Sequence, residues 1–202
     1  VGTGSQEMIT AAIEDNDILV SVSPDSNIPV NGIRVQGAAD GSSISVRANR
    51  IVVNGASGPA VGVVVETTGT SSSVELTTNV ISVEGQSSAT GITCVRAIGE
   101  SATSGTGLLI SGNEIIVNVD SDAPAAAQAI KLSGMAGEIA RNRIVVHSST
   151  GGATGIVIDK DGSVDVDVVY NVLSIDGYGN ATGLDVSGGG PVRVVNNTIM
   201  VR

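Results

Sequence analysis

The chain is poor in aromatic side chains: its 202 residues include no tryptophan, no phenylalanine and only two tyrosines, Tyr170 and Tyr178. A compact globular core normally draws much of its buried area from aromatic rings. The apolar residues here are mainly Val, Ile, Leu and Ala, and the β-branched members of this group favour strands. This composition indicates thin, repeated layers of small aliphatic side chains rather than one thick core.

Cysteine and histidine are almost absent, with one residue of each, Cys94 and His147. A single cysteine excludes an intrachain disulfide. A lone histidine with no cysteine or second histidine near it argues against a transition-metal site. We interpret Cys94 as a small buried residue without reactivity, because it falls on the inward side of its strand, and His147 as a residue of a surface loop.

Positive charge is scarce, and the formal net charge is −10. Such a surface repels phosphate backbones and anionic membranes, which argues against a nucleic-acid partner. No apolar run approaches the length of a membrane-spanning segment, so we expect no membrane insertion.

One short phrase recurs along the chain: Asn, any residue, Ile or Leu, any residue, Val or Ile. Its clearest copy is Asn142-Arg143-Ile144-Val145-Val146. Successive copies are separated by 33, 30, 34, 29, 29 and 26 residues, and a repeat of about 30 residues is typical of a solenoid. The asparagines of the seven copies are Asn16, Asn49, Asn79, Asn113, Asn142, Asn171 and Asn197.

Each unit contains three short stretches of alternating aliphatic residues, and strict alternation predicts strands with one face buried. Between the second and third stretches the alternation shifts by one residue, and the asparagine lies at this shift. We expect the chain to turn there with the asparagine pointing inward and itself adopting the dihedral angles of the tight bend. Stacked asparagines would then form a hydrogen-bonded ladder between layers.

The repeated Asn-x-Ile-x-Val phrase, with a Gly-Ile-x-Val strand between copies, resembles the right-handed parallel β-helix proteins of the pectate-lyase-like fold. The resemblance covers about residues 9–201. It implies an all-β, right-handed parallel β-helix solenoid of about seven coils, with three short strands per coil and an inward Asn ladder. The family includes polysaccharide lyases, hydrolases, epimerases, phage tailspikes, periplasmic copper-pathway proteins and surface adhesins, so the resemblance does not specify a function.

We expect residues 1–202 to form a single β-helix domain without terminal caps. Unpaired strand edges at the ends of a solenoid are normally covered. Three explanations remain open for this chain: a fragment of a longer β-helix, a subunit that stacks end to end, or a terminal cap that the sequence pattern does not reveal.

Lys131 is the candidate for a catalytic base. Lyases of this fold use a basic residue beside acidic residues or Ca²⁺, and by alternation Lys131 is expected on the outer surface with Asp159 and Asp185 in the next layers. The alternative interpretation is a solvated lysine in an exposed ion pair. We therefore assign no catalytic residue, and whether the chain is an enzyme stays open, with the weight of the sequence against it.

The candidates for a metal site are Asp159, Asp161 and Asp165, which echo part of a calcium-binding loop around Gly162. The remaining ligands of such a loop are missing, and an Asp-Gly turn between two strands explains the same residues without metal. Ca²⁺ is the only cofactor that the sequence suggests, and we expect none.

One outward column is apolar where it should meet water, and such a strip commonly marks a contact surface. The column consists of the second outward-facing residue after each asparagine. Two of its seven members, Ser82 and Ser174, are polar, and the other five are apolar. Its apolar members, which we call the apolar strip, are Leu19, Val52, Ile116, Val145 and Met200.

These observations predict a non-catalytic structural or adhesive protein of the cell surface or extracellular space. It would be a β-helical rod that associates with itself or with other surface proteins, end to end or through the apolar strip. The alternative is a carbohydrate-active enzyme or sugar-binding module of the polysaccharide-lyase type, with Lys131 as its base and carbohydrate as its partner.

Overall fold

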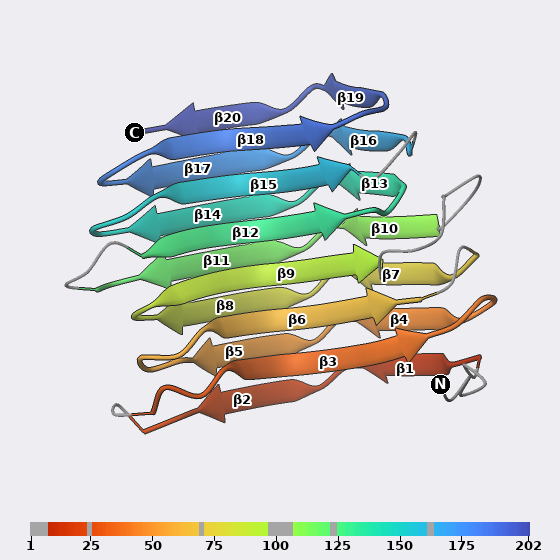
Figure 1. Cartoon of the computed structure of the whole chain (residues 1–202), viewed down its shortest axis with the longest axis horizontal. Coiled ribbons are helices and arrows are strands. Elements are labelled where there is room, and N and C mark those ends of the chain that lie inside the picture. The colour runs from red at the N-terminus through yellow and green to blue at the C-terminus, as the bar shows by residue number, and fades with distance from the viewer. Residues whose placement is uncertain (1–7, 24–25, 69–70, 97–106, 122–124, 161–163) are drawn as a thin grey trace, which may run out of the picture.

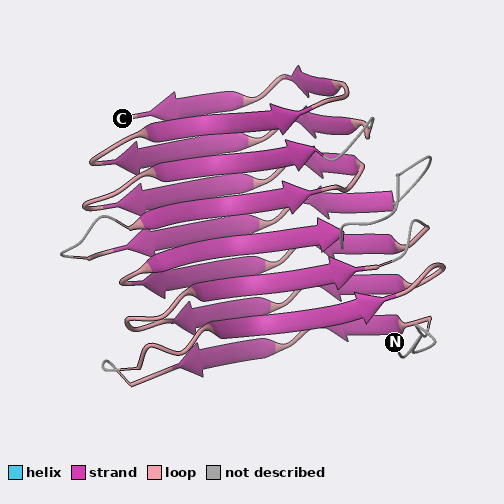
Figure 2. Ribbon diagram, in the orientation of Figure 1, coloured by secondary structure: helices cyan, strands magenta, loops and turns pink. Residues whose placement is uncertain are grey.

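A computed structural model describes residues 8–23, 26–68, 71–96, 107–121, 125–160 and 164–202. These residues form twenty strands, which wind into a parallel β-helix of six to seven coils (Figure 1). The N-terminal and C-terminal coils lie at opposite ends of the stack. Figure 2 shows strands joined by short turns, and no helix in the described part of the chain is long and apolar enough to cross a membrane.

The strands belong to three parallel sheets, each containing one strand from every coil. Sheet A contains β1 (Thr10–Glu14), β4 (Ser43–Arg47), β7 (Ser73–Thr77), β10 (Gly107–Ser111), β13 (Gly137–Ala140), β16 (Val166–Val169) and β19 (Val192–Val195). Sheet B contains β2 (Asp17–Ser21), β5 (Arg50–Asn54), β8 (Val80–Gly85), β11 (Glu114–Val119), β14 (Arg143–Ser148), β17 (Val172–Gly177) and β20 (Thr198–Val201). Sheet C contains β3 (Val30–Ala38), β6 (Ala60–Thr67), β9 (Ser88–Arg96), β12 (Ala126–Ser133), β15 (Ala153–Lys160) and β18 (Ala181–Gly188).

The interior is a stack of aliphatic layers, as the composition predicts. Equivalent residues of successive coils pair in register, so Ile51, Ile81, Ile115 and Ile144 lie over one another in sheet B. All four are at most 1% exposed. Because each layer repeats the same small side chains, the coils fill a narrow core without aromatic rings.

The seven asparagines form a continuous ladder at the turn between sheets A and B, which confirms the predicted stacking. Asn113 is typical: its Nδ2 donates to Asn142 Oδ1 (3.0 Å) and to the carbonyl of Leu76 (2.7 Å). Its own Oδ1 accepts the backbone N–H and the Nδ2–H of Asn79 at 2.9 and 3.0 Å. The five central asparagines are at most 1% exposed, so each rung joins three coils through buried polar groups.

The prediction that the asparagines themselves adopt the dihedral angles of the bend is wrong. The left-handed residue at each bend is the one before the asparagine, and only one of these seven residues is a glycine. The amide of this residue donates to a carbonyl of the next coil, as Ala48 does to Thr77 at 3.1 Å. The asparagine is therefore retained for its side-chain hydrogen bonds, while its neighbour makes the bend. The residues with φ between 54° and 66° are Asp15, Ala48, Thr78, Gly112, Arg141, Tyr170 and Asn196.

The coils are also joined by ion pairs on the outer surface. Asp17 and Arg50 form a pair at 3.0 Å, and Glu114 pairs with Arg143. Three further pairs follow the same pattern between neighbouring coils: Arg34 with Glu66, Arg47 with Glu14, and Arg193 with Asp167. Because these groups are well exposed, each pair stabilises the fold little and serves mainly to favour the correct register.

Candidate functional site

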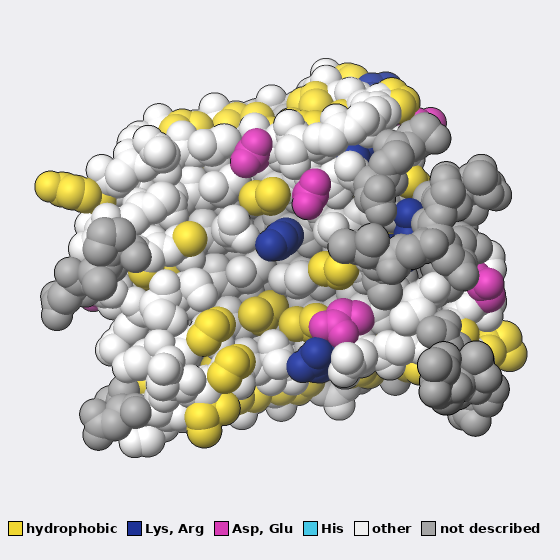
Figure 3. All heavy atoms as spheres, viewed as in Figure 1, with side chains coloured by type: hydrophobic (Ala, Val, Ile, Leu, Met, Phe, Trp, Pro, Cys, Tyr) yellow, Lys and Arg dark blue, Asp and Glu magenta, His cyan; other side chains and the backbone are white. Residues whose placement is uncertain are grey.

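Lys131 lies on the outer face of sheet C, as predicted, and Asp159 and Asp185 lie in the two coils that follow it. Its register partners in the neighbouring coils are Thr93 and Val157. Asp185 lies one coil beyond Val157, and Asp159 pairs with Ser133 rather than with Lys131. No ion pair to Lys131 is found among the described residues. Figure 3 shows this face with only a few scattered charged side chains, so the described residues do not surround Lys131 with acidic groups.

The three aspartates proposed for calcium are only partly described. Asp159 is exposed at the end of β15, where it accepts a hydrogen bond from Ser187 Oγ at 3.2 Å. Asp165 is exposed just before β16, and Asp161 lies outside the described residues. Among the described residues no group of three His, Cys, Asp or Glu side chains could hold a metal ion. The calcium site therefore stays a prediction.

The apolar strip occupies one register column of sheet B. Leu19 pairs with Val52 in the first two coils, and Ile116 with Val145 further along. The end members Leu19 and Met200 are 69% and 45% exposed, whereas the central members are half-buried. The position of the strip on the outer surface is confirmed, and its role as a contact surface stays a prediction.

Cys94 is fully buried in sheet C, as predicted, and burial raises the pKa of its thiol to about 12. A thiol that stays protonated at neutral pH is a poor nucleophile. His147, in contrast, is not in a loop: it is a residue of strand β14, on the outer face of sheet B. Its Nδ1 lies 3.5 Å from Asp176 Oδ2 of the next coil.

His147 belongs to a polar groove at the end of sheet B that the sequence did not indicate. Four register partners on neighbouring coils form its floor: Asn54, Glu84, Asn118 and His147. The groove is an open cavity of about 600 Å³. Its other lining residues are Gly55, Gly85, Gln86 and Asp120. Apart from the two glycines, the described lining residues carry amides, carboxylates and the imidazole of His147, and none is a lysine or arginine.

A second polar feature is buried at the turn from sheet C to sheet A. Thr67, Arg96 and Lys160 continue the inward-facing alternation of their strands by one further step, beyond Val65, Cys94 and Ile158. They are 0%, 4% and 5% exposed. Thr67 and Arg96 are register partners in neighbouring coils. A buried hydroxyl and two buried cations therefore share one column of the interior, which we call the polar column.

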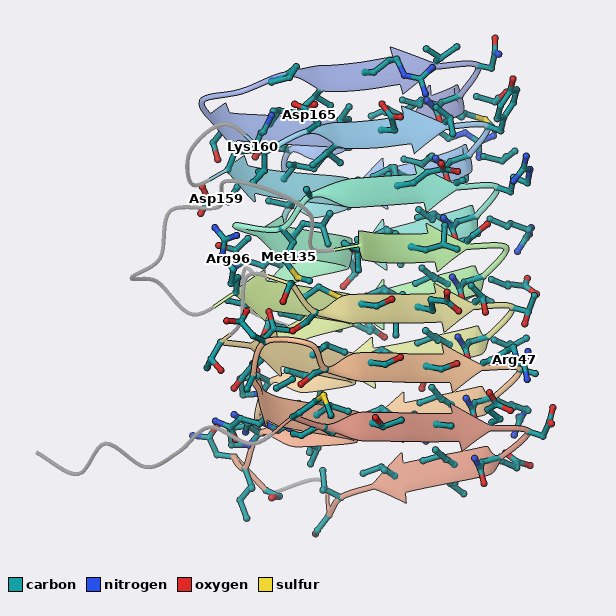
Figure 4. The ribbon with its side chains drawn as sticks, turned by 90° about the vertical axis from the view of Figure 1, so that its right-hand side faces the viewer. Arg47, Arg96, Met135, Asp159, Lys160 and Asp165 are labelled. Atoms are coloured by element: carbon teal, nitrogen blue, oxygen red, sulfur yellow. The ribbon has the colours of Figure 1, made fainter. Side chains whose placement is uncertain are left out.

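The members of the polar column differ in their hydrogen bonding. Lys160 Nζ donates to the carbonyl of Pro191 at 2.6 Å. Burial lowers the pKa of the Lys160 ammonium, and the nearby Asp165 carboxylate opposes this effect. Thr67 Oγ1 and Arg96 Nη1 are buried and make no hydrogen bond. In Figure 4, Lys160 and Arg96 lie along the same edge of the molecule, with Asp165 near Lys160.

The polar column was not predicted, because we considered polar residues as candidates only at the outward-facing positions of each strand. The signal is present in the sequence: Ile92-x-Cys94-x-Arg96 and Ile156-x-Ile158-x-Lys160 place a cation on the inward side. The polar groove could have been found by extending the third strand of each unit by one outward position.

The parallel β-helix is established by the geometry alone. In comparisons with known proteins, no family model matches the chain, and no curated protein or solved structure matches it significantly.

Proposed function

We propose that this chain is a non-catalytic structural protein of the cell surface or extracellular space, a β-helical rod that associates through its coils. The observation that supports this role best is the uninterrupted ladder, in which a buried asparagine of each coil bonds to the next coil. Five Arg–carboxylate pairs add contacts between neighbouring coils. These five pairs engage ten charged side chains of the lateral faces in contacts between coils.

The first and last coils offer complementary groups for end-to-end association. Each asparagine donates toward the next coil, so Asn16 at one end presents an acceptor Oδ1, and Asn197 at the other presents its backbone N–H. The last coil also exposes Ile199 and Val201, which are 42% and 44% exposed. A coil from a second copy, or from a neighbouring segment of a longer polypeptide, would continue both the ladder and the aliphatic layers. We propose that a second copy takes this place.

Electron microscopy of the purified protein tests the assembly. We expect rods whose length increases with protein concentration, because head-to-tail contacts do not close. Ile199→Lys places a charge on the terminal coil and should abolish the rods, whereas Val145→Lys alters only the apolar strip and should leave end-to-end growth intact. If only Val145→Lys prevents association, the strip is the contact. Particles of single-copy length at every concentration would contradict assembly, and lyase activity on acidic polysaccharides that is lost in Lys131→Ala would contradict a non-catalytic role.

Sugar binding is a second candidate, supported by the polar groove. The side chains of Asn54, Glu84 and Asn118 make no hydrogen bonds with other described residues, unlike the paired charges of the adjacent surface. Amide and carboxylate groups that repeat about every 4.8 Å along the stack suit the hydroxyls of an extended saccharide. Because Glu84 and Asp120 are acidic and no lysine or arginine is among the described lining residues, the groove favours neutral or amino sugars over acidic ones.

Calorimetric titration with neutral and amino oligosaccharides tests this second candidate. We expect binding that falls at least tenfold in Glu84→Ala/Asn118→Ala and is unchanged in Lys131→Ala. Tighter binding of polygalacturonate than of either neutral or amino chains would be incompatible with the acidic groove.

A further inference from the structure

Arg96 is a buried charge that has no counter-charge among the described residues. Its side chain is 4% exposed, Nη1 makes no hydrogen bond, and none of the ion pairs among the described residues includes it. The arginines that do form ion pairs lie on the surface, and their side chains are 48–62% exposed. Burying a guanidinium without an anion is strongly unfavourable. A fold whose formal net charge is −10 would be expected to pair such a cation.

The second buried atom without a partner lies beside it. Among the described residues only two buried side-chain polar atoms lack a hydrogen bond, Thr67 Oγ1 and Arg96 Nη1. Their residues are direct register partners in neighbouring coils and have the same inward orientation. Two unsatisfied donors in adjacent layers of one column point to a shared acceptor.

The rest of the column carries positive charge as well. Gly134 follows Ser133, the partner of Val95 and Asp159, and therefore takes the place between Arg96 and Lys160. This position has no side chain, and its φ is 66°. Lys160 ends the series with its ammonium group held by Pro191 O. Its ammonium group leaves the donors of Arg96 and Thr67 free, and the nearby Asp165 carboxylate offsets part of its positive charge.

We propose that the polar column is a binding site for a small tetrahedral oxyanion, held by the Arg96 guanidinium and the Thr67 hydroxyl. Guanidinium groups bind sulfate and phosphate oxygens through directed, charge-assisted hydrogen bonds. The enclosure of both residues selects a free inorganic ion over a phosphate group carried on a larger molecule. This site lies apart from the polar groove, and it does not depend on the proposed structural role of the rod.

Thermal unfolding in sulfate or phosphate, compared with chloride at equal ionic strength, tests the proposal. A ligand that binds only the folded state raises the midpoint in a concentration-dependent way. We expect a saturable rise for the natural chain, an affinity at least tenfold lower in Thr67→Val, and no saturable rise in Arg96→Met. The variant Arg47→Met is the matched control, because Arg47 lies at the opposite edge of the molecule in an exposed pair with Glu14. It should retain the full rise and report any general salting effect of sulfate.

The order of stability of the natural chain and Arg96→Met should reverse when the oxyanion is added, and this reversal distinguishes an anion site from a purely structural arginine. Without oxyanion, Arg96→Met should be at least as stable as the natural chain, because it removes an unpaired buried charge. At saturating sulfate, the natural chain should unfold at the higher temperature. The proposal is overturned if the natural chain and Arg96→Met respond identically to sulfate and phosphate. Equal stabilisation by a sugar phosphate would contradict an enclosed site for a small ion.

Discussion

Asn113→Ala is expected to lower the free energy of unfolding by roughly 4 kcal/mol, because it leaves several buried polar groups without partners at about 1–3 kcal/mol each. The backbone N–H and the Nδ2 of Asn79 would lose their acceptor, and the carbonyl of Leu76 would lose the donor at 2.7 Å. The alanine cannot replace any of these bonds. Urea denaturation followed by far-ultraviolet circular dichroism measures the change.

Asn16→Ala makes the same chemical change at the exposed end of the ladder and is the control. Asn16 Nδ2 donates to Glu14 O and Asn49 Oδ1, but no described coil precedes it, and the backbone N–H of Asn16 still reaches Asn49 in the variant. We expect a loss of about 1 kcal/mol or less. Equal losses at both positions would show that the ladder adds nothing beyond the local turn.

Gly137→Ala is expected to destabilise the fold by about 4 kcal/mol, although alternation suggests the opposite. Gly137 occupies a column of sheet A that is filled by Leu108 and Val166 in the adjacent coils, so a larger residue would restore the pattern of the repeat. The backbone prevents this: φ is 151°, and an added Cβ would lie 2.1 Å from Leu108 O. Met135, only 1% exposed, joins the core from the same segment.

Two further glycines separate the causes of this effect. At Gly107 an added Cβ would meet nothing within 4 Å and no left-handed φ is involved, so Gly107→Ala should change stability by less than about 0.5 kcal/mol. At Gly37 the space is also open but φ is 78°, so Gly37→Ala should cost about 1 kcal/mol. Chemical denaturation of the three variants should therefore rank them Gly137, Gly37, Gly107. A Gly137→Ala variant as stable as Gly107→Ala would contradict the steric explanation.

The alternation of aliphatic residues was sufficient to predict the strands, the sheets and the ladder, because every coil packs the same residue types at equivalent positions. It failed where a coil departs from the repeat. Gly137 lacks the aliphatic side chain that its column has in the adjacent coils, and nothing in the spacing indicates that Met135, two residues earlier, is buried in the core.

The conformation of the bend was also beyond the sequence pattern. Residues as different as Asp15, Ala48 and Arg141 take the same left-handed angles, so the position has no characteristic residue type. The surrounding hydrogen bonds impose the conformation, and they become visible only when adjacent coils are in place. The same holds for Arg96, because exposed arginines are the rule and its burial depends on contacts between coils.

The asparagine ladder also has an electrical consequence. All its side-chain carboxamides point the same way, with each carbonyl oxygen facing the preceding coil and accepting from that coil's asparagine. Aligned amide dipoles add, as peptide units do along an α-helix. The outermost carbonyl oxygen, on Asn16, gives that end of the column a partial negative charge, and the opposite end is partially positive. The row of amides thus forms a permanent dipole along the rod axis. Its field favours cations at the first coil and anions at the last.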